Sequence, residues 1–253
     1  MRLLLSNDDG ILARGLAALE RAALALGDVY VVAPDREQSA TSHSLTMHHP
    51  LRPVQIGDRR WQVDGTPTDC VMLALEALLP ERPDYVLSGA NHGPNMGEDV
   101  LYSGTVAAAM EGLALGVPAI AFSFAGSVVR ADAQLDDHIG TMERILRHIT
   151  SLPVFPENTL FNVNIPPIAA SELKGFRLTR LGRRAYSDSL TRMKDPWGRP
   201  IYWIGGGSVD WTDSAPDSDF QAIADGFVSI TPLHLDLTHR AILDSADQWW
   251  RPL

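Results

Sequence analysis

The pattern of apolar and polar positions along the chain predicts alternating strands and helices. Short apolar runs bounded by turn residues are typical of parallel strands, which are covered on both faces and need not alternate polar with apolar residues. Such runs occupy residues 1–5, 28–34, 84–89, 118–124 and 160–165. Helical spacing of apolar residues is found over 15–26, 66–79, 103–113 and 136–150. This order predicts a Rossmann-like α/β fold with a doubly wound, mostly parallel sheet.

The C-terminal third departs from this alternation. Residues 176–186 alternate like a β-hairpin, and residues 193–204 are aromatic and contain two prolines. Three glycines at 205–207 interrupt the chain before a short helix over 219–224 and a last strand over 227–231. This part is typical of an extended β-hairpin excursion rather than of a core.

The chain contains no internal repeat and no low-complexity linker. We therefore expect one domain over residues 1–253, with a core of about 1–170 and a C-terminal excursion of about 171–253. A second hairpin is predicted within the core, because residues 53–56 and 60–63 flank a Gly-Asp turn.

Polar loops follow the first three long strands of the predicted sheet. Asp8 and Asp9 end the first strand, Ser39 lies in the loop 35–44, and Asn91 lies in the loop 90–99. Ligands of open parallel sheets bind beyond the carboxyl ends of the strands, so these loops should converge. Their oxygen donors suit Mg²⁺ or Mn²⁺ and argue against zinc, which prefers His and Cys.

The segment Ser103-Gly104-Thr105 opens a predicted helix, whose free backbone N–H groups form an anion site. An anion site beside a metal site indicates phosphate chemistry, in which the metal polarises a phosphoryl oxygen and activates water. The alternative is that Asp8 caps the next helix while Asp9 faces solvent. Asp69 is expected to stabilise the first turn of its helix rather than to bind a ligand.

Composition limits the partners. The chain has a formal net charge of -10 and only two lysines, which argues against binding of long nucleic acids. Its single cysteine, Cys70, excludes an internal disulfide and a multi-cysteine zinc site. The apolar runs are too short for a secretory signal or a membrane span. We expect a cytoplasmic protein with no membrane partner.

Several motifs, taken in order, closely resemble the SurE family, the stationary-phase survival proteins. The resemblance covers nearly the whole chain. Its motifs are residues 5–10, 33–35 with Ser39, 65–70, 88–91, 103–106, 111–112, 162–166 and 226–233. It implies a metal-dependent phosphatase of nucleoside 5′- and 3′-monophosphates, with short polyphosphate as a further substrate.

The resemblance also implies roles for individual residues. One divalent metal ion per subunit, Mg²⁺ or Mn²⁺, would be held by Asp8, Asp9, Ser39 and Asn91, and the two aspartates would be the catalytic residues. The phosphate would lie among Asn95, Ser103, Gly104 and Thr105. Family members are dimers or tetramers that exchange C-terminal segments, which implies a homodimer or homotetramer here. Three tryptophans of the excursion would serve as anchors for a partner subunit or as a wall for a base: Trp197, Trp203 and Trp211.

Some roles stay open at this level. His43 and His92 lie in site loops, where either one would protonate the leaving oxygen or merely bond a loop carbonyl. Asn95 would contact phosphate or hold the shape of its own loop. Two competing functions are a non-catalytic, metal-dependent nucleotide sensor and a phosphotransfer enzyme whose Asp8 or Asp9 attacks phosphorus.

Overall fold

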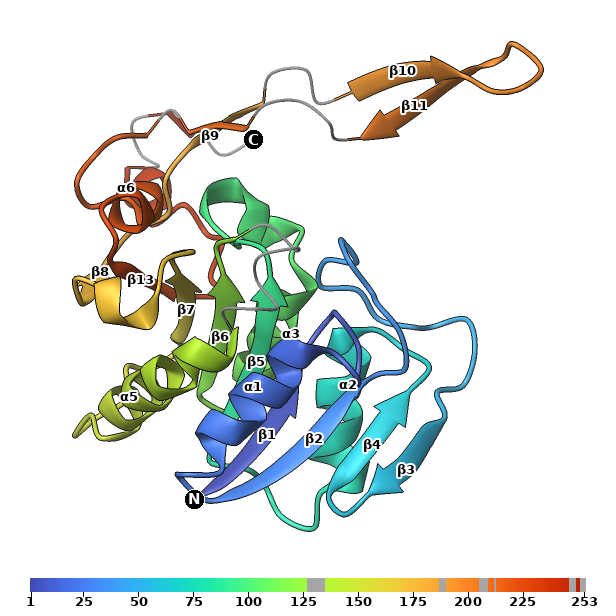
Figure 1. Ribbon diagram of the computed structural model, residues 1–253, viewed down its shortest axis with the longest axis vertical. Helices are drawn as coiled ribbons and strands as arrows, with labels where there is room; N and C mark the ends of the chain where they lie inside the picture. The colour runs from blue at the N-terminus through green and yellow to red at the C-terminus, as the bar shows by residue number, and fades with distance from the viewer. Residues whose placement is uncertain (127–134, 187–189, 205–208, 212, 246–248, 251–253) are drawn as a thin grey trace.

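A nine-stranded sheet forms the centre of the protein (Figure 1). The computed structural model describes residues 1–126, 135–186, 190–204, 209–211, 213–245 and 249–250. In spatial order the strands are β3 (Pro53–Gly57), β4 (Arg60–Val63), β2 (Asp28–Pro34), β1 (Arg2–Ser6), β5 (Tyr85–His92), β6 (Ala119–Phe124), β7 (Leu160–Ile165), β13 (Val228–Leu233) and β8 (Phe176–Leu178).

The strands from β4 to β7 are parallel, which confirms the predicted Rossmann-like fold. The hairpin partner β3 runs antiparallel to β4 at one edge, as predicted. At the other end β13 is antiparallel to β7 and parallel to β8. The chain moves outward from β1 to β2 on one side and from β5 to β7 on the other. The order therefore reverses between β1 and β5, and this switch point is where ligands bind in such sheets.

Helices cover both faces of the parallel strands. On one face lie α1 (Arg14–Ala23) and α5 (Ile139–Thr150), which follows the 3₁₀ turn Leu135–His138. On the other face lie α2 (Pro67–Leu73), which continues as a π turn over Ala74–Leu78, and α3 (Gly104–Ala114).

The run Leu3-Leu4-Leu5 shows why the first strand has no polar alternation. All three side chains are fully buried. Leu3 and Leu5 pack into the core under α1 and α5, whereas Leu4 packs into the core under α2 and α3. Successive side chains of a strand point to opposite faces, so a strand covered on both sides buries every position.

A capping box starts α2. The Thr66 hydroxyl accepts a hydrogen bond from the Asp69 amide at 3.1 Å, and Asp69 Oδ2 accepts one from the Thr66 amide at 2.8 Å. Asp69 Oδ1 also accepts from the amide of Thr46 at 3.0 Å, which fixes the loop before the hairpin. The prediction that Asp69 stabilises its own helix is confirmed.

The loop predicted to begin at Ala90 starts later, because β5 continues to His92. The register with β6 shifts between Ser88 and Asn91, after which Asn91 pairs with Ser123. Gly89 lies within this irregularity with φ of +110°, and a Cβ there would lie 2.2 Å from the Phe122 carbonyl oxygen. The strand thus passes its bulge at a glycine and brings Asn91 to the end of the sheet.

The hairpin predicted over residues 176–186 is wrong. β8 joins the main sheet beside β13, whereas β9 (Arg184–Tyr186) pairs with β12 (Val209–Trp211). Thr179, which follows β8, bonds to β13 rather than to a hairpin partner. Its hydroxyl lies 2.8 Å from the hydroxyls of Ser229 and of Thr231.

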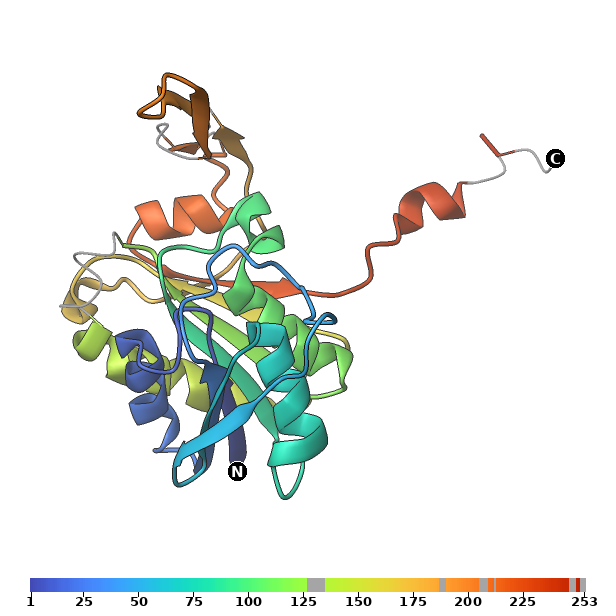
Figure 2. The same ribbon diagram turned by 90° about the vertical axis from the view of Figure 1, so that its right-hand side faces the viewer.

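The excursion itself projects from the body. Its far part is a hairpin of β10 (Leu190–Lys194) and β11 (Pro200–Ile204), reached through β9 and β12 (Figure 1). The glycine break predicted at 205–207 lies outside the described residues. The chain returns through α6 (Asp219–Ala224) to β13 and then leaves the body as an arm with α7 (Arg240–Asp244) (Figure 2).

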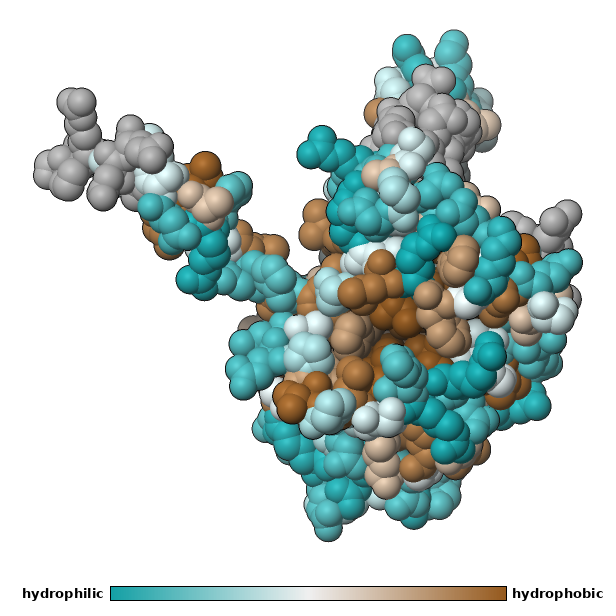
Figure 3. Space-filling view, turned by 90° about the vertical axis from the view of Figure 1, so that its left-hand side faces the viewer, coloured by the Kyte–Doolittle hydropathy of each residue, from teal (hydrophilic) through white to brown (hydrophobic). Residues whose placement is uncertain are grey.

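The outer end of the sheet exposes apolar surface. A pocket of about 400 Å³ lies between α5 and β8, and Phe176 and Leu178 of β8 are partly exposed (Figure 3). Its lining residues are His148, Ile149, Leu152, Phe161, Phe176, Leu178 and Ile230. No helix among the described residues is long and apolar enough to cross a membrane.

Two helical glycines test how closely α3 approaches the sheet. A Cβ on Gly112 would lie 2.7 Å from Val86 Cγ2 and 2.8 Å from Val86 Cβ, whereas a Cβ on Gly140 of α5 would have nothing within 4 Å. We expect Gly112→Ala to lower the free energy of unfolding by about 1–3 kcal/mol through overpacking. Gly140→Ala should raise it by up to about 1 kcal/mol through helix propensity. Urea denaturation measures both, and equal effects would contradict the close packing.

Candidate functional site

The loop after β1 is held from both sides. The Asn7 side chain donates a hydrogen bond to the Gly10 carbonyl at 3.0 Å, and Gly10 turns the chain with φ of +96°. The Ile11 amide bonds the carbonyl of Pro34 at 2.8 Å, and the Gln38 amide bonds the carbonyl of Asp8 at 2.7 Å. The end of β1 and the loop after β2 are therefore in direct contact, as the predicted convergence requires.

The Asp8 side chain lies buried against the start of α3. The Thr105 hydroxyl donates a hydrogen bond to Asp8 Oδ1. A Cβ on Gly104 would lie 2.8 Å from Asp8 Cβ and 3.0 Å from its Oδ2, so only glycine allows this approach. These contacts bring Asp8 and the Ser-Gly-Thr segment together, and their roles towards a metal and a phosphate stay predictions.

Burial raises the pKa of Asp8 from 3.8 to about 6. The Thr105 hydrogen bond opposes this shift, and the neighbouring charge of Asp9 adds to it. A carboxylate in this position is ionised at neutral pH at a cost in free energy, since it has lost hydration and has a like charge beside it. A bound cation would remove that cost.

Asp9 connects the first loop to the end of β5. Its Oδ2 accepts a hydrogen bond from the His92 amide at 3.2 Å and lies 3.2 Å from His92 Nδ1. Asn91 uses its side-chain nitrogen to bond the Gly93 carbonyl at 3.0 Å, so the predicted metal contact would have to come from its side-chain oxygen. The alternative that Asp9 simply faces solvent is wrong, because its carboxylate contacts β5.

Ser39 lies in the loop that is tied to Asp8 and to the residue before Ser103. Its hydroxyl donates a hydrogen bond to Glu37 at 2.6 Å, which leaves the lone pairs of the oxygen for a metal. The Ser42 amide bonds the Tyr102 carbonyl at 3.3 Å. Ala40 and Ser42 have positive φ values of 57° and 54°, a strained conformation that only a well-fixed loop maintains.

His43 is fixed to α3 by a residue that the sequence did not single out. Its Nε2 lies 2.8 Å from Glu111 Oε2, and Glu111 is only 6% exposed. A glutamate within the apolar stripe of a helix is a signal that such a partner exists, since buried carboxylates are paired. His43 therefore does not bond a loop carbonyl, as the simple alternative supposed.

Asn95 is held by hydrogen bonds to the ends of β6 and β7. Its amide donates to Asn164 Oδ1 at 2.9 Å, and its carbonyl accepts from the side chains of Asn162 and Asn164 at 2.8 and 2.9 Å. Its own side-chain nitrogen donates to the Ser123 hydroxyl at 2.8 Å. These bonds support the view that Asn95 holds its loop, and a phosphate contact stays a prediction.

Asn162 and Asn164 were not proposed as site residues from the sequence. They lie at alternate positions of a buried strand, so both point to the same face and require partners. That spacing in an otherwise apolar strand was the available signal.

Ser103 caps α3, because its hydroxyl accepts a hydrogen bond from the Val106 amide at 3.0 Å. The amides of Gly104 and Thr105 belong to the first turn of an eleven-residue helix. Such N–H groups and the positive end of the helix dipole favour an anion. An anion here would lie next to Asp8, which repels it unless a cation stands between them.

The residues present fit a hard divalent cation. The two aspartates, the Ser39 hydroxyl and the Asn91 oxygen are oxygen donors on two loops and on the end of β5. Among the described residues no group of three or more His, Cys, Asp or Glu side chains is arranged to hold a metal ion. The assignment of these four residues as ligands stays a prediction.

Comparison with known proteins identifies the family of this chain. The family model described as "Survival protein SurE" matches residues 3–188. The chain belongs to the SurE family. A Gemmatimonas aurantiaca protein named 5′-nucleotidase SurE is 72% identical over 99% of both chains. A Vibrio cholerae protein of the same name is 49% identical over 98% of this chain and 97% of its own length.

The solved structures agree with the sequence comparison. The crystal structure of the SurE protein from Aquifex aeolicus superposes with a TM-score of 0.86 at 43% sequence identity, over 98% of this chain and 99% of that one. The family resemblance and the fold expected from the sequence are thus confirmed over nearly the whole length.

The raised pKa of Asp8 predicts a stability change that does not depend on turnover. Its folded pKa of about 6 exceeds the ordinary 3.8, so the folded metal-free protein loses stability as the pH rises through 6. We expect Asp8→Asn, in the presence of chelator, to be more stable than the parent at pH 8 by up to about 3 kcal/mol. The difference should shrink towards pH 4.

Denaturation with urea at several pH values measures this difference. Asn can still accept the Thr105 hydrogen bond, so packing is preserved. Asp58→Asn, in the exposed turn between β3 and β4, provides a matched control, because it removes the same charge away from the site. A parent that is more stable than Asp8→Asn at every pH would contradict the assigned burial cost.

Proposed function

We propose that the chain is a metal-dependent phosphomonoesterase that hydrolyses nucleoside 5′- and 3′-monophosphates to nucleoside and phosphate. The observation that carries this proposal is the buried Asp8 carboxylate placed directly against the first turn of α3. A carboxylate that favours a cation and a helix start that favours an anion lie in contact. The names of the similar proteins, 5′-nucleotidase SurE, support a nucleotide as the phosphate ester.

The residues of the site have separate proposed roles. Asp8, Asp9, Ser39 and Asn91 hold one Mg²⁺ or Mn²⁺ per subunit, which when bound would polarise a phosphoryl oxygen and lower the pKa of a water. The amides of Gly104 and Thr105, with Ser103 and Asn95, orient the phosphate and stabilise its charge. Asn95, Ser103, Gly104 and Thr105 together form the proposed phosphate cradle. Asp8 takes a proton from the attacking water in this proposal, because its carboxylate adjoins that cradle.

Short polyphosphate is a further proposed substrate, since it presents the same terminal phosphoryl group. The runner-up is a non-catalytic, metal-dependent nucleotide sensor with the same ligands. The formation of an acyl phosphate on Asp8 or Asp9 is the other competing mechanism. The sensor and the acyl-phosphate mechanism each predict a different outcome from metal-activated water in the assay described next.

The first test is phosphate release from a panel of nucleoside 5′- and 3′-monophosphates with Mg²⁺, Mn²⁺ or chelator. We expect metal-dependent release that falls about 100- to 1,000-fold in Asp8→Asn, the scale of losing one electrostatic stabiliser. Asp58→Asn again serves as the control and should be unchanged. Tight metal-dependent binding without release from folded protein would favour the sensor. Trapping of a phosphorylated Asp8 or Asp9 during turnover would favour the acyl phosphate.

We propose His92 rather than His43 as the general acid for the leaving oxygen. His92 contacts Asp9, whereas His43 is bonded to Glu111 of α3. His92→Asn should lower kcat by about 100-fold or more, the usual contribution of a general acid. His43→Asn should change KM more than kcat, because it loosens the loop 38–44. The reverse pattern in steady-state kinetics would assign the acid to His43.

We propose that the protein assembles as a homodimer or homotetramer through its C-terminal segments. The excursion and the arm expose large apolar side chains that nothing in this chain covers among the described residues: Leu190, Trp197, Trp203, Ile204, Leu237, Trp249 and Trp250. Aromatic and aliphatic side chains on projecting segments are typical of subunit contacts. This surface supports Trp197 and Trp203 as anchors, while Trp211 lies among residues whose side chains are not described.

A further inference from the structure

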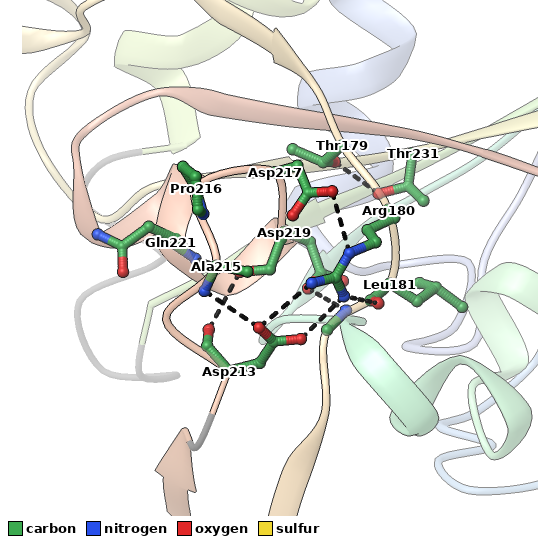
Figure 4. Close-up of polar contacts among 12 residues, drawn as sticks. Thr179, Arg180, Leu181, Asp213, Ala215, Pro216, Asp217, Asp219, Gln221 and Thr231 are labelled. Carbon is green, nitrogen blue, oxygen red and sulfur yellow. Dashed lines mark hydrogen bonds and ion pairs between the residues drawn. The ribbon is translucent and has the colours of Figure 1, made fainter.

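Asp219, the first residue of α6, is a buried carboxylate outside the proposed catalytic set. Its residue is 0% exposed, and its two oxygens accept hydrogen bonds from three backbone amides. Oδ2 accepts from Gly97 at 2.8 Å, and Oδ1 accepts from Gly182 at 2.8 Å and from Phe220 at 2.9 Å. Figure 4 shows this side chain among the polar contacts at the base of the excursion.

The three amides come from segments with different tasks. Gly97 begins the 3₁₀ turn Gly97–Leu101, which lies between Asn95 and Ser103. Gly182 lies between β8 and β9, where the excursion leaves the sheet. Phe220 belongs to α6. One carboxylate therefore connects the loop between two proposed phosphate-binding residues to residues 179–183, which lie between β8 and β9 and form the stem of the excursion.

The backbones at this junction are in contact. A Cβ on Gly97 would lie 2.8 Å from the Gly182 carbonyl oxygen and 2.8 Å from Phe220 Cζ, and Gly97 has φ of +54°. A Cβ on Gly182 would lie 2.4 Å from Phe220 Cδ2. A side chain at either position would push the site loop away from the stem.

A separate set of bonds fastens α6 to the stem. Arg180 Nη1 lies 2.8 Å from Asp213 Oδ2, and its Nε lies 3.1 Å from Asp217 Oδ2 (Figure 4). The Arg180 amide bonds the Asp217 carbonyl at 2.9 Å, and the Asp219 amide bonds the Arg180 carbonyl at 3.0 Å. These bonds hold residues 213–219 without using the Asp219 carboxylate. The carboxylate adds bonds to Gly182, Phe220 and Gly97, and of these only the bond to Gly97 reaches the site loop.

The Asp219 carboxylate is well suited to fix a loop. Burial raises its pKa, and the three backbone hydrogen bonds oppose that shift by favouring the ionised form. Hydrogen bonds to a charged acceptor are stronger and more strictly oriented than those between neutral groups. In a dry interior, the loss of one such acceptor leaves the donating amide without compensation.

We infer that Asp219 is a positioning residue, which fixes the loop from Asn95 to Ser103 against the base of the excursion and so sets the geometry of the phosphate cradle. The inference rests on the proposed function for its kinetic consequence, but its structural content does not. The Asp219 side chain thus links the base of the C-terminal excursion directly to the site loop.

Asp219→Asn tests the inference with little change in volume. An amide offers one acceptor atom, which the two donors at Oδ1 will take, so its NH₂ group faces the Gly97 amide. The affinity for inorganic phosphate, measured as competitive inhibition of nucleotide hydrolysis, should fall about tenfold, the scale of one lost charge-assisted bond. KM should rise in parallel, with a smaller change in kcat.

Asp213→Asn is the matched control. It removes an ion pair of Arg180 in the same segment but has no bond to Gly97, so phosphate affinity should stay within about twofold of the parent. Both variants are expected to melt at lower temperature, so thermal stability alone does not distinguish them. A folded Asp219→Asn with unchanged phosphate affinity, or an equal loss in Asp213→Asn, would overturn the inference.

Hydrogen exchange separates this inference from the proposed function. Amides of residues 93–105 should exchange faster in Asp219→Asn than in the parent, and at the parent rate in Asp213→Asn. If the parent hydrolyses no phosphomonoester, the proposed function fails while this comparison still decides the positioning role. If Asp219→Asn does not fold, exchange in the unmodified protein decides it. The Gly97 amide should then be protected as well as the Gly182 amide, and rapid exchange at Gly97 alone would overturn the inference.

Discussion

The contact between the Asp8 carboxylate and the start of α3 is the constraint on which the rest of the site depends. It requires glycine at position 104 and a hydroxyl at position 105, because the helix begins against the carboxylate itself. It also requires β1 and β5 to be neighbours, since α3 follows β5 in the chain. The reversal of strand order between these two strands is therefore the topological condition for placing negative charge and an anion-binding helix start side by side.

That juxtaposition has a thermodynamic consequence. Asp8 is buried next to Asp9, and its pKa rises to about 6 because ionisation there is costly without a cation. The fold thus places an unfavourable charge at a position where a bound cation would remove the cost. Similarly, the positive φ values of Ala40 and Ser42 lie in the loop that also contains Ser39. Two of the four described non-glycine residues with positive φ therefore lie in the same region as this costly charge, a combination that is typical of binding sites.

Much of the fold and the convergence of the loops could be predicted from the sequence, because buried parallel strands and the turns after them leave strong local patterns. Leu3-Leu4-Leu5 followed by two aspartates is an example. The failures share a physical cause. The alternation in residues 176–186 could not reveal that β8 pairs with β13, since that partner lies some fifty residues away. Glu111, Asn162, Asn164 and Asp219 were missed as site residues because their partners come from distant segments. A polar residue in an apolar helix or strand indicates that a partner exists, but only the folded chain shows which one.

These missed residues explain how a site made of loops is kept in place. Asn162 and Asn164 hold Asn95 from the strand ends, Glu111 holds His43 from α3, and Asp219 holds Gly97 from the stem. Each is a buried polar side chain that bonds a loop at the carboxyl edge of the sheet. The loops can therefore present donors to a ligand with little loss of conformational entropy on binding, since their conformations are fixed beforehand. The last of these supports comes from the C-terminal third, so the base of the excursion shares a buried hydrogen-bond network with the loop between Asn95 and Ser103.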